Sequence, residues 1–138
     1  MPFVIDASVA ACWLLPDEGH DVATAAFNRL ITDHALVPSL WWFEMRNLFI
    51  VNERRGRLDH EKTSRALALL SELPIRLDHT PDSPSVLQLA RRHRLTVYDA
   101  AYLELAQREV APLATLDDAL TRAAMAEGVP LVGVCWVD

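Results

Sequence analysis

Short β-prone runs alternate with longer helical segments along the whole chain, and this alternation constrains the fold more than any other feature. Such alternation favours a mostly parallel sheet with helices on both faces. We therefore expect an α/β protein, a three-layer α/β/α fold with a mostly parallel central sheet. The predicted strands cover 3–5, 35–38, 75–79, 111–115 and 130–134. The predicted helices cover 18–32, 40–54, 60–72, 84–93, 97–109 and 118–127.

Single residues mark several of the predicted helix ends. Ser39 and Asp59 are predicted N-caps, because their side-chain oxygens can accept hydrogen bonds from the first free N–H groups of a helix. Pro84 suits the first turn of the helix that contains it, and Gly128 follows the last predicted helix.

The length and composition fit one domain that covers residues 1–138. An acid or a proline interrupts each apolar run before the roughly 18 residues that a membrane span needs, and no basic segment opens the chain as in a signal peptide. We therefore expect a cytoplasmic protein with no membrane contact.

The net charge of −6 argues against nonspecific coating of nucleic acid. It leaves room for a local site near the arginine clusters at 53–57 and 91–94.

Carboxylates stand at unusual places in this pattern. Asp6 directly follows the first strand, and Asp117 and Asp118 follow the strand predicted over 111–115. In parallel α/β sheets, ligands bind beyond the carboxyl ends of the strands. Glu44 lies in an apolar helix, and Asp99 stands next to an apolar helical stripe. The sequence therefore indicates an acidic site built from four separate segments.

Each of these carboxylates also has a structural explanation, which the sequence leaves open. Asp6, and either Asp117 or Asp118, would each cap the helix that follows. Thr96 and Asp99 have the spacing of a capping box, with Asp in place of Glu. Glu44 is too far inside its helix to be a cap, so its structural explanation is an ion pair with a distant arginine.

Converging carboxylates repel one another, and a cation would relieve this repulsion. Neither the histidines nor the cysteines recur at zinc-ligand spacing. Hard oxygen ligands without soft ones suit Mg²⁺ or Mn²⁺. Such ions neutralise phosphate charge and activate water at neutral pH, so the pattern indicates chemistry on phosphate esters.

Four segments carry a resemblance to a known family. They are "VIDASV" at 4–9, "FEMRNL" at 43–48, "TVYDAAYLELA" at 96–106 and "LATLDDAL" at 113–120. In order and spacing they resemble the signature segments of PIN domains, and more narrowly those of the VapC toxins of bacterial toxin–antitoxin pairs. The resemblance spans nearly the whole chain and implies a PIN-like fold.

The resemblance also implies an activity. The family's members are metal-dependent endoribonucleases that cut single-stranded or looped RNA and are held inactive by an antitoxin of the VapB type. The family's catalytic and metal-binding acids fall on Asp6, Glu44, Asp99 and Asp117. Its usual supporting polar positions match Ser8, Asn47 and Thr115, and Asp118 could approach the metal through water.

We therefore expect a VapC-like ribonuclease that uses Mg²⁺ or Mn²⁺. Two alternatives remain open at this stage. One is another magnesium-dependent phosphohydrolase of α/β fold with a small phosphate substrate, and the other is a non-catalytic protein-binding module. The aromatic segment 41–50 spreads over more than one face of its helix, which predicts a homodimer that uses part of this helix. The alternative for this helix is that it is enclosed within one subunit.

Overall fold

The computed structural model describes residues 1–15 and 19–133. Four strands and seven helices follow one another in these ranges. The strands are β1 (Phe3–Ile5), β2 (Ala35–Pro38), β3 (Ile75–Asp78) and β4 (Leu113–Ala114). The helices are α1 (Ala7–Leu14), α2 (Asp21–Arg29), α3 (Leu40–Arg54), α4 (His60–Glu72), α5 (Ser83–His93), α6 (Val97–Arg108) and α7 (Asp118–Ala126).

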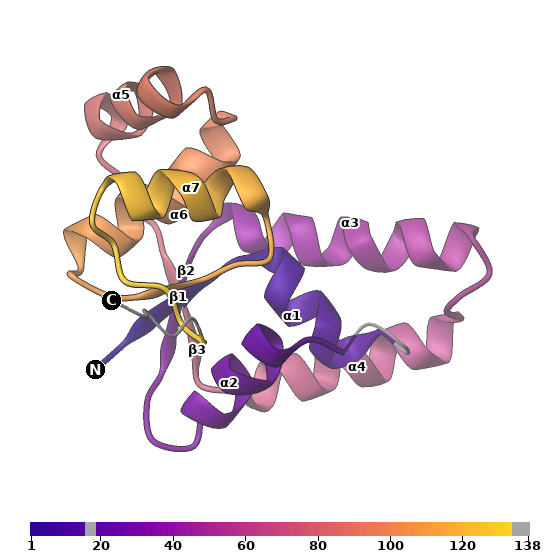
Figure 1. Ribbon diagram of the computed structural model, residues 1–138. Helices are drawn as coiled ribbons and strands as arrows, with labels where there is room; N and C mark the ends of the chain where they lie inside the picture. Colours follow the sequence, from indigo (N-terminus) through magenta and orange to yellow (C-terminus); the bar gives the residue numbers. More distant parts are fainter. Residues whose placement is uncertain (16–18, 134–138) are drawn as a thin grey trace.

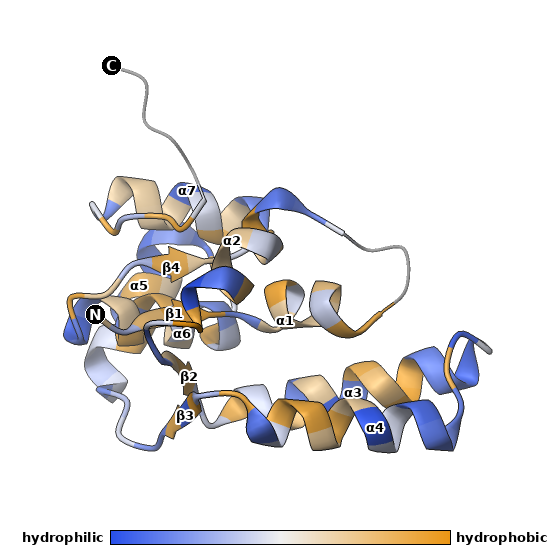
Figure 2. Cartoon of the chain, turned by 90° about the horizontal axis from the view of Figure 1, so that it is seen from below, coloured by the Kyte–Doolittle hydropathy of each residue, from blue (hydrophilic) through white to orange (hydrophobic). Residues whose placement is uncertain are grey.

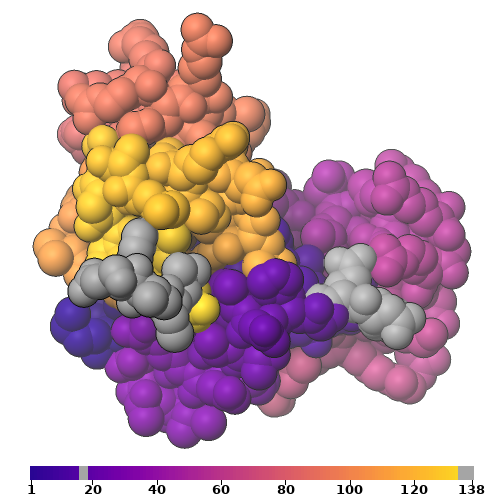
Figure 3. Space-filling model, in the orientation of Figure 1, coloured from indigo at the N-terminus to yellow at the C-terminus, as the bar shows by residue number. Residues whose placement is uncertain are grey.

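The strands form one sheet in the order β3-β2-β1-β4, and every pair is parallel. Helices α5, α6 and α7 lie on one side of it, and α1 and α2 lie on the other (Figure 1). This confirms the predicted three-layer α/β arrangement. Helices α3 and α4 follow β2 and project as an arm beyond the rest of the molecule (Figures 1 and 3).

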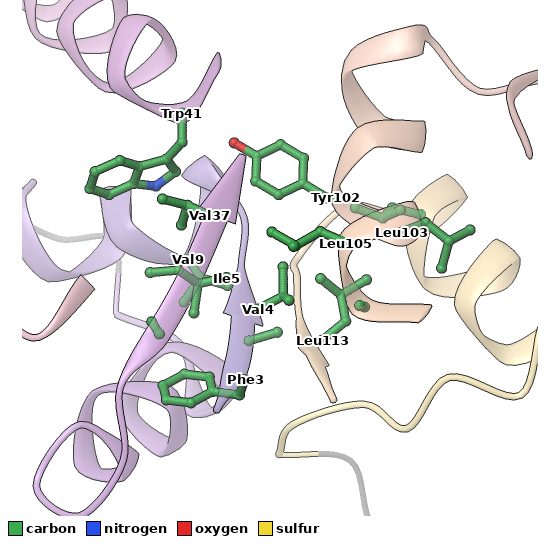
Figure 4. Close-up of a cluster of buried hydrophobic side chains, with 14 of the residues drawn as sticks. Phe3, Val4, Ile5, Val9, Val37, Trp41, Tyr102, Leu103, Leu105 and Leu113 are labelled. Atoms are coloured by element: carbon green, nitrogen blue, oxygen red, sulfur yellow. The ribbon is translucent and has the colours of Figure 1, made fainter. Parts of the chain in front are cut away.

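The core lies where β1 meets the helices on both faces. All three residues of β1 are fully buried, as a strand covered on both sides requires. Figure 4 shows Phe3 and Val9 beside the sheet, and Tyr102 from α6 with its hydroxyl turned toward the start of α3. The central strand is therefore a rigid base for any residue that follows it.

Several predicted boundaries are wrong for reasons that the backbone shows. β4 begins at residue 113 rather than 111, because Ala111 N–H already bonds Ala106 O and Pro112 has no N–H to donate. Of the predicted strand 130–134, Leu131 makes only an isolated parallel bridge to Leu113. Gly133 has a φ of +77°, which ends the extended backbone there, and residue 134 lies outside the described residues.

The capping predictions were half correct. Asp59 caps α4, since its carboxylate accepts a hydrogen bond from Lys62 N–H at 2.8 Å. The prediction that Ser39 caps α3 is wrong, because its backbone is already in the right-handed helical region and its side chain makes no capping bond.

The helix predicted over 18–32 is too long, because α2 covers only 21–29 and hydrogen-bonded turns follow it. Residue 18 lies outside the described ranges.

No helix among the described residues is both long and apolar enough to cross a membrane. Apolar residues are instead distributed over several helices and strands, interrupted by hydrophilic ones (Figure 2).

The end of α6 supports a first prediction, on stability. Val110 is 81% exposed and has a φ of +50°, and the next N–H bonds back to Ala106 O at 2.9 Å. Glycine normally occupies this left-handed position after a helix. We expect Val110→Gly to raise the free energy of unfolding by about 1 kcal/mol. Val97→Gly, the same change in a right-handed helix, should instead lower it by a few tenths of a kcal/mol. Chemical denaturation measures both, and a destabilised Val110→Gly variant would contradict the argument.

Candidate active site

The strand order reverses at β1, and this reversal positions the candidate site. The chain passes from β1 to β2 and β3 on one side, then returns to pair β4 on the other side of β1. Ligands of open α/β sheets bind at such switch points, beyond the carboxyl ends of the strands. Asp6 directly follows β1 and Thr115 directly follows β4, so both lie at this crevice.

Asp6 is held at the crevice from three directions. Only 5% of it is exposed. Its Oδ1 accepts hydrogen bonds from Ser8 Oγ at 2.5 Å and from Val9 N–H at 3.2 Å, the second of which caps α1. Its Oδ2 accepts a hydrogen bond from the Thr115 hydroxyl. Asp6 therefore caps α1, as one reading of the sequence predicted, and it lies at the crevice where the sequence predicted a site.

Ser8 and Thr115 also fix the loop that carries the next acid. Ser8 Oγ accepts from Leu116 N–H at 3.1 Å, and Thr115 Oγ1 accepts from Asp117 N–H at 3.0 Å. The carboxylate of Asp117 accepts from Leu120 N–H at 2.8 Å and so caps α7. The two hydroxyl residues thus contact Asp6 and the loop after β4, and the supporting role that the resemblance implies for them stays a prediction.

Glu44 reaches the same region from α3. Its Oε1 accepts a hydrogen bond from Tyr102 Oη of α6 at 2.5 Å. Burial raises the pKa of Tyr102, and the Glu44 carboxylate raises it further, so the phenol stays protonated as the donor. No ion pair joins Glu44 to an arginine among residues 1–15 and 19–133. The structural explanation of Glu44 as half of such a pair is therefore wrong.

Asp99 enters from the first turn of α6. Thr96 is the N-cap and accepts a hydrogen bond from Asp99 N–H at 3.1 Å. This is one half of the predicted capping box. The Asp99 carboxylate itself is half-buried, and its charge contributes to the raised pKa values of Asp6 and Glu44.

Burial raises the pKa values of Asp6, Glu44 and Asp99, and neighbouring carboxylate charges add to each rise. Burial raises the pKa of Asp6 against the hydrogen bonds that lower it, and the Asp99 charge adds to the rise. Burial also raises the pKa of Glu44, with contributions from Asp6 and Asp99. The pKa of Asp99 is raised by burial and then by the Asp117 charge. The four acids therefore form one electrostatic cluster, the acid cluster.

The donor set decides which cation suits this cluster. No three His, Cys, Asp or Glu side chains of the described residues lie close enough together to form a ready-made metal cage. Mg²⁺ is commonly held by one or two carboxylates together with waters and substrate phosphates rather than by such a cage. Hard carboxylate oxygens from separate segments around one crevice fit this mode of binding. Asp6 and Asp99 would hold the ion, with Glu44 and Asp117 beside them.

The remaining predicted residues lie at the margin of the site. Asn47 lines a cleft together with Glu44, whereas Asp118 is exposed at the start of α7. Tyr102 was missed as part of the site. Its place in an apolar stripe looked structural, and no spacing in the sequence indicated that it would meet Glu44, which is 58 residues away.

The class that fold and site define together is an α/β domain with one buried and three half-buried carboxylates around the switch point of its sheet. A family model described as "PIN domain" matches residues 3–125. The chain is 33% identical over 120 residues to Ribonuclease VapC3 of Pyrobaculum aerophilum, a match that covers 85% of this chain and 90% of that protein. The chain therefore belongs to the PIN-domain family and to its VapC ribonuclease branch.

Solved structures share the fold. The crystal structure of PAE2754 from Pyrobaculum aerophilum has a TM-score of 0.69 at 25% identity and covers 89% of this chain and 84% of its own. A toxin–antitoxin complex from Klebsiella pneumoniae has a TM-score of 0.66 at 15% identity, with coverage of 96% and 98%. The second similarity is one of fold alone.

Proposed function

We propose that this chain is a metal-dependent endoribonuclease that acts in the cytoplasm as the toxin of a toxin–antitoxin pair. The acid cluster at the switch point is the observation that carries the proposal. The relative named Ribonuclease VapC3 supports RNA as the substrate. Bound Mg²⁺ or Mn²⁺ would supply charge neutralisation at phosphate and activation of water.

The chain's own residues divide the remaining work. Asp6 is fixed by Ser8 and Thr115, so it is a preorganised ligand with little freedom to turn. Glu44 is held through one oxygen by Tyr102, and its raised pKa brings it closer to the operating pH, as suits a general base. It would take a proton from the attacking water. As the water oxygen bonds phosphorus, the bond to the 3′ oxygen breaks, and that oxygen takes up a proton from solvent. The products carry a 5′-phosphate and a 3′-hydroxyl.

Cleavage of a single-stranded RNA oligonucleotide with Mg²⁺, Mn²⁺ or EDTA tests the proposal. We expect cleavage with either metal and none with EDTA, and ligation that requires a 5′-phosphate identifies the ends. Hydrolysis of nucleotides or sugar phosphates but not RNA would favour the small-substrate phosphohydrolase. Mn²⁺ binding without any turnover would favour a non-catalytic module. Sequencing of 5′ ends in cells after controlled expression would locate the natural target.

The acid cluster also suggests how a partner inhibits the enzyme. An arginine from an antitoxin can pair with carboxylates in place of the metal. We expect a purified VapB-like antitoxin to inhibit RNA cleavage, and excess Mg²⁺ to relieve part of the inhibition. An antitoxin in which that arginine is replaced by alanine is the control. Inhibition that is wholly insensitive to metal would mean that the antitoxin blocks the enzyme elsewhere.

The surface of α3 supports the prediction of a homodimer. Phe43 is 69% exposed, and Trp42 and Ile50 are 42% exposed each, so the helix is not enclosed within one subunit. We expect the isolated chain to be dimeric in light scattering at tens of micromolar, with this face in the two-fold interface. Ile50→Glu should shift it to monomer, whereas the same change at Ile31, exposed beyond α2, should not. A monomeric wild type would refute the prediction.

A further inference from the structure

A cleft of 330 Å³ runs from the acid cluster along one face of α3, beside the start of α1. Glu44 and Asn47 line the end at the cluster, and Asn52 and Arg55 line the other end. This volume is at the lower end of the roughly 300–1,000 Å³ of small-molecule sites. The assignment of the acid cluster leaves the far end of the cleft without a role.

Asn52 has a buried acceptor with no donor. The residue is 6% exposed, and its Nδ2 donates to Leu48 O at 2.8 Å. That bond fixes which end of the amide is which, because a carbonyl can only accept. The Oδ1 atom is then buried without a hydrogen bond among the described residues. Such an atom costs free energy that a ligand's donor would recover.

Arg55 adds a cation to the same end of the cleft. Its side chain is exposed and enters no ion pair within residues 1–15 and 19–133. Residues 44 and 55 lie about 16 Å apart along the helix axis, at about 1.5 Å per residue. The long arginine side chain can shorten this distance to the scale of one or two nucleotides. The cleft is thus acidic at one end and basic at the other.

We propose that this cleft is a subsite for the nucleotide next to the scissile phosphate, with Arg55 on its outer phosphate and Asn52 Oδ1 as acceptor for its sugar or base. The proposal rests on the proposed ribonuclease function. A single-stranded RNA brings a phosphate and a hydrogen-bond donor at each nucleotide, the 2′-hydroxyl or an N–H of the base. The terminal torsion of an asparagine is broad, so a small rotation of the Asn52 amide would open Oδ1 to such a donor without reversing the bond from Nδ2 to Leu48 O.

The charges favour a nucleotide over a peptide arginine at this end. Arg55 would repel a second guanidinium, whereas it attracts phosphate. A polyanion also needs a cation beside the acid cluster to keep its strand in register, because phosphate contacts position nucleic acid. Arg55 supplies that contact at the end of the cleft farthest from the acids.

The test compares Arg55→Ala with Arg54→Ala, which changes the last residue of α3 and does not line the cleft. Both variants lose one positive charge, so their difference isolates the cleft contact. We expect Arg55→Ala to raise KM for RNA at least about fivefold more than Arg54→Ala does, with kcat nearly unchanged. For Arg55→Ala, the slope of log KM against log salt concentration should be smaller than that of wild type by about one. Equal effects in the two variants would overturn the subsite.

A second variant tests the buried acceptor. Asn52→Leu removes it without leaving a polar atom, and we expect a folded protein with KM raised about three- to tenfold. Oligonucleotides with one 2′-deoxy position, or one guanosine replaced by inosine, show whether sugar or base supplies the donor. The modification that removes the donor should weaken binding to wild type but not to Asn52→Leu. If neither modification has an effect that depends on Asn52, the acceptor role is wrong.

These results separate the subsite from the proposed function. A wild-type protein that cleaves no RNA would refute the ribonuclease. A wild type that cleaves RNA, with both Arg55→Ala and Asn52→Leu equal to Arg54→Ala in KM, would refute the subsite alone.

Discussion

Asp99→Asn should lower RNA cleavage by more than about 100-fold while leaving the metal-free protein at least as stable as wild type at neutral pH. The substitution removes a carboxylate that belongs to the acid cluster but caps no helix, since Thr96 is the cap of α6. Asp6→Asn should likewise abolish cleavage. Its amide oxygen can still accept the bonds from Ser8 and Val9, so the fold should be kept.

The pKa directions give the sign of the stability change. The pKa values of Asp6, Glu44 and Asp99 are raised in the folded protein, so the native state binds protons that the unfolded chain has released. Stability without metal therefore falls as the pH rises from about 4 through the raised pKa values, and is level above them. Asp99→Asn removes part of this loss. Denaturation at several pH values with EDTA should show a shallower fall for the variant.

Two further variants control this prediction. Glu72→Gln removes a charge from the exposed end of α4 and should change neither cleavage nor the pH profile. Asp118→Asn should reduce cleavage far less than Asp99→Asn, because Asp118 is exposed beside the cluster. Full activity in both Asp6→Asn and Asp99→Asn would refute the metal site. A large loss of stability without metal would instead mean that these residues serve mainly the fold.

The fold was predictable because the lengths, composition and order of the apolar segments all indicate a parallel α/β sheet. The apolar run at 3–5 is short, β-prone and followed by a polar residue, and the helical segments between strands have the right length for parallel crossovers. The acids Asp6 and Asp117 could be found from the same pattern, because strand ends locate the sites of parallel sheets. Their roles as helix caps did not exclude this, since a cap occupies only one of the two carboxylate oxygens.

Contacts between distant segments were not predictable from one sequence. Nothing in the spacing pairs Tyr102 with Glu44, because helical periodicity describes one helix and not its neighbour. The unpaired Oδ1 of Asn52 could not be predicted either, since a sequence does not show which buried groups lack hydrogen-bond partners. The strand predicted over 111–115 is too long because Ala111 N–H bonds Ala106 O at the end of α6 and is not available to the sheet. β-Propensity does not account for such a local hydrogen bond.

Arg108→Met should be the most destabilising of the substitutions considered for this chain, because it leaves a buried carboxylate without a cation. Glu104 is 3% exposed, and Arg108 Nε bonds it at 2.8 Å. The same guanidinium bonds Asp78 at 2.7 and 3.1 Å and so ties α6 to the end of β3. Asp82 N–H also donates to Glu104 at 3.2 Å, which adds the start of α5. Arg108 and Glu104 together thus connect three elements.

Breaking a buried pair costs about 3–5 kcal/mol when the remaining charge is trapped. We expect about 2–4 kcal/mol for Arg108→Met, because the guanidinium is partly exposed and water screens it. Methionine keeps the apolar stem, so the loss would measure the charge and its hydrogen bonds. Arg65→Met, which removes an exposed pair with Glu61, should cost less than about 0.5 kcal/mol.

The double variant Arg108→Met with Glu104→Gln decides between the two sources of such a loss. If the trapped charge dominates, the double variant should be more stable than Arg108→Met alone, because no unpaired carboxylate remains. If the loss comes from packing or from Asp78, the second change should bring no recovery. The pKa of Asp78 is lowered by its hydrogen bonds from Arg108, so wild type should also lose stability as the pH falls through that value. Arg108→Met should lose less stability over the same pH range. If the variant and wild type lost the same stability as the pH falls, Arg108 would not stabilise the ionised form of Asp78.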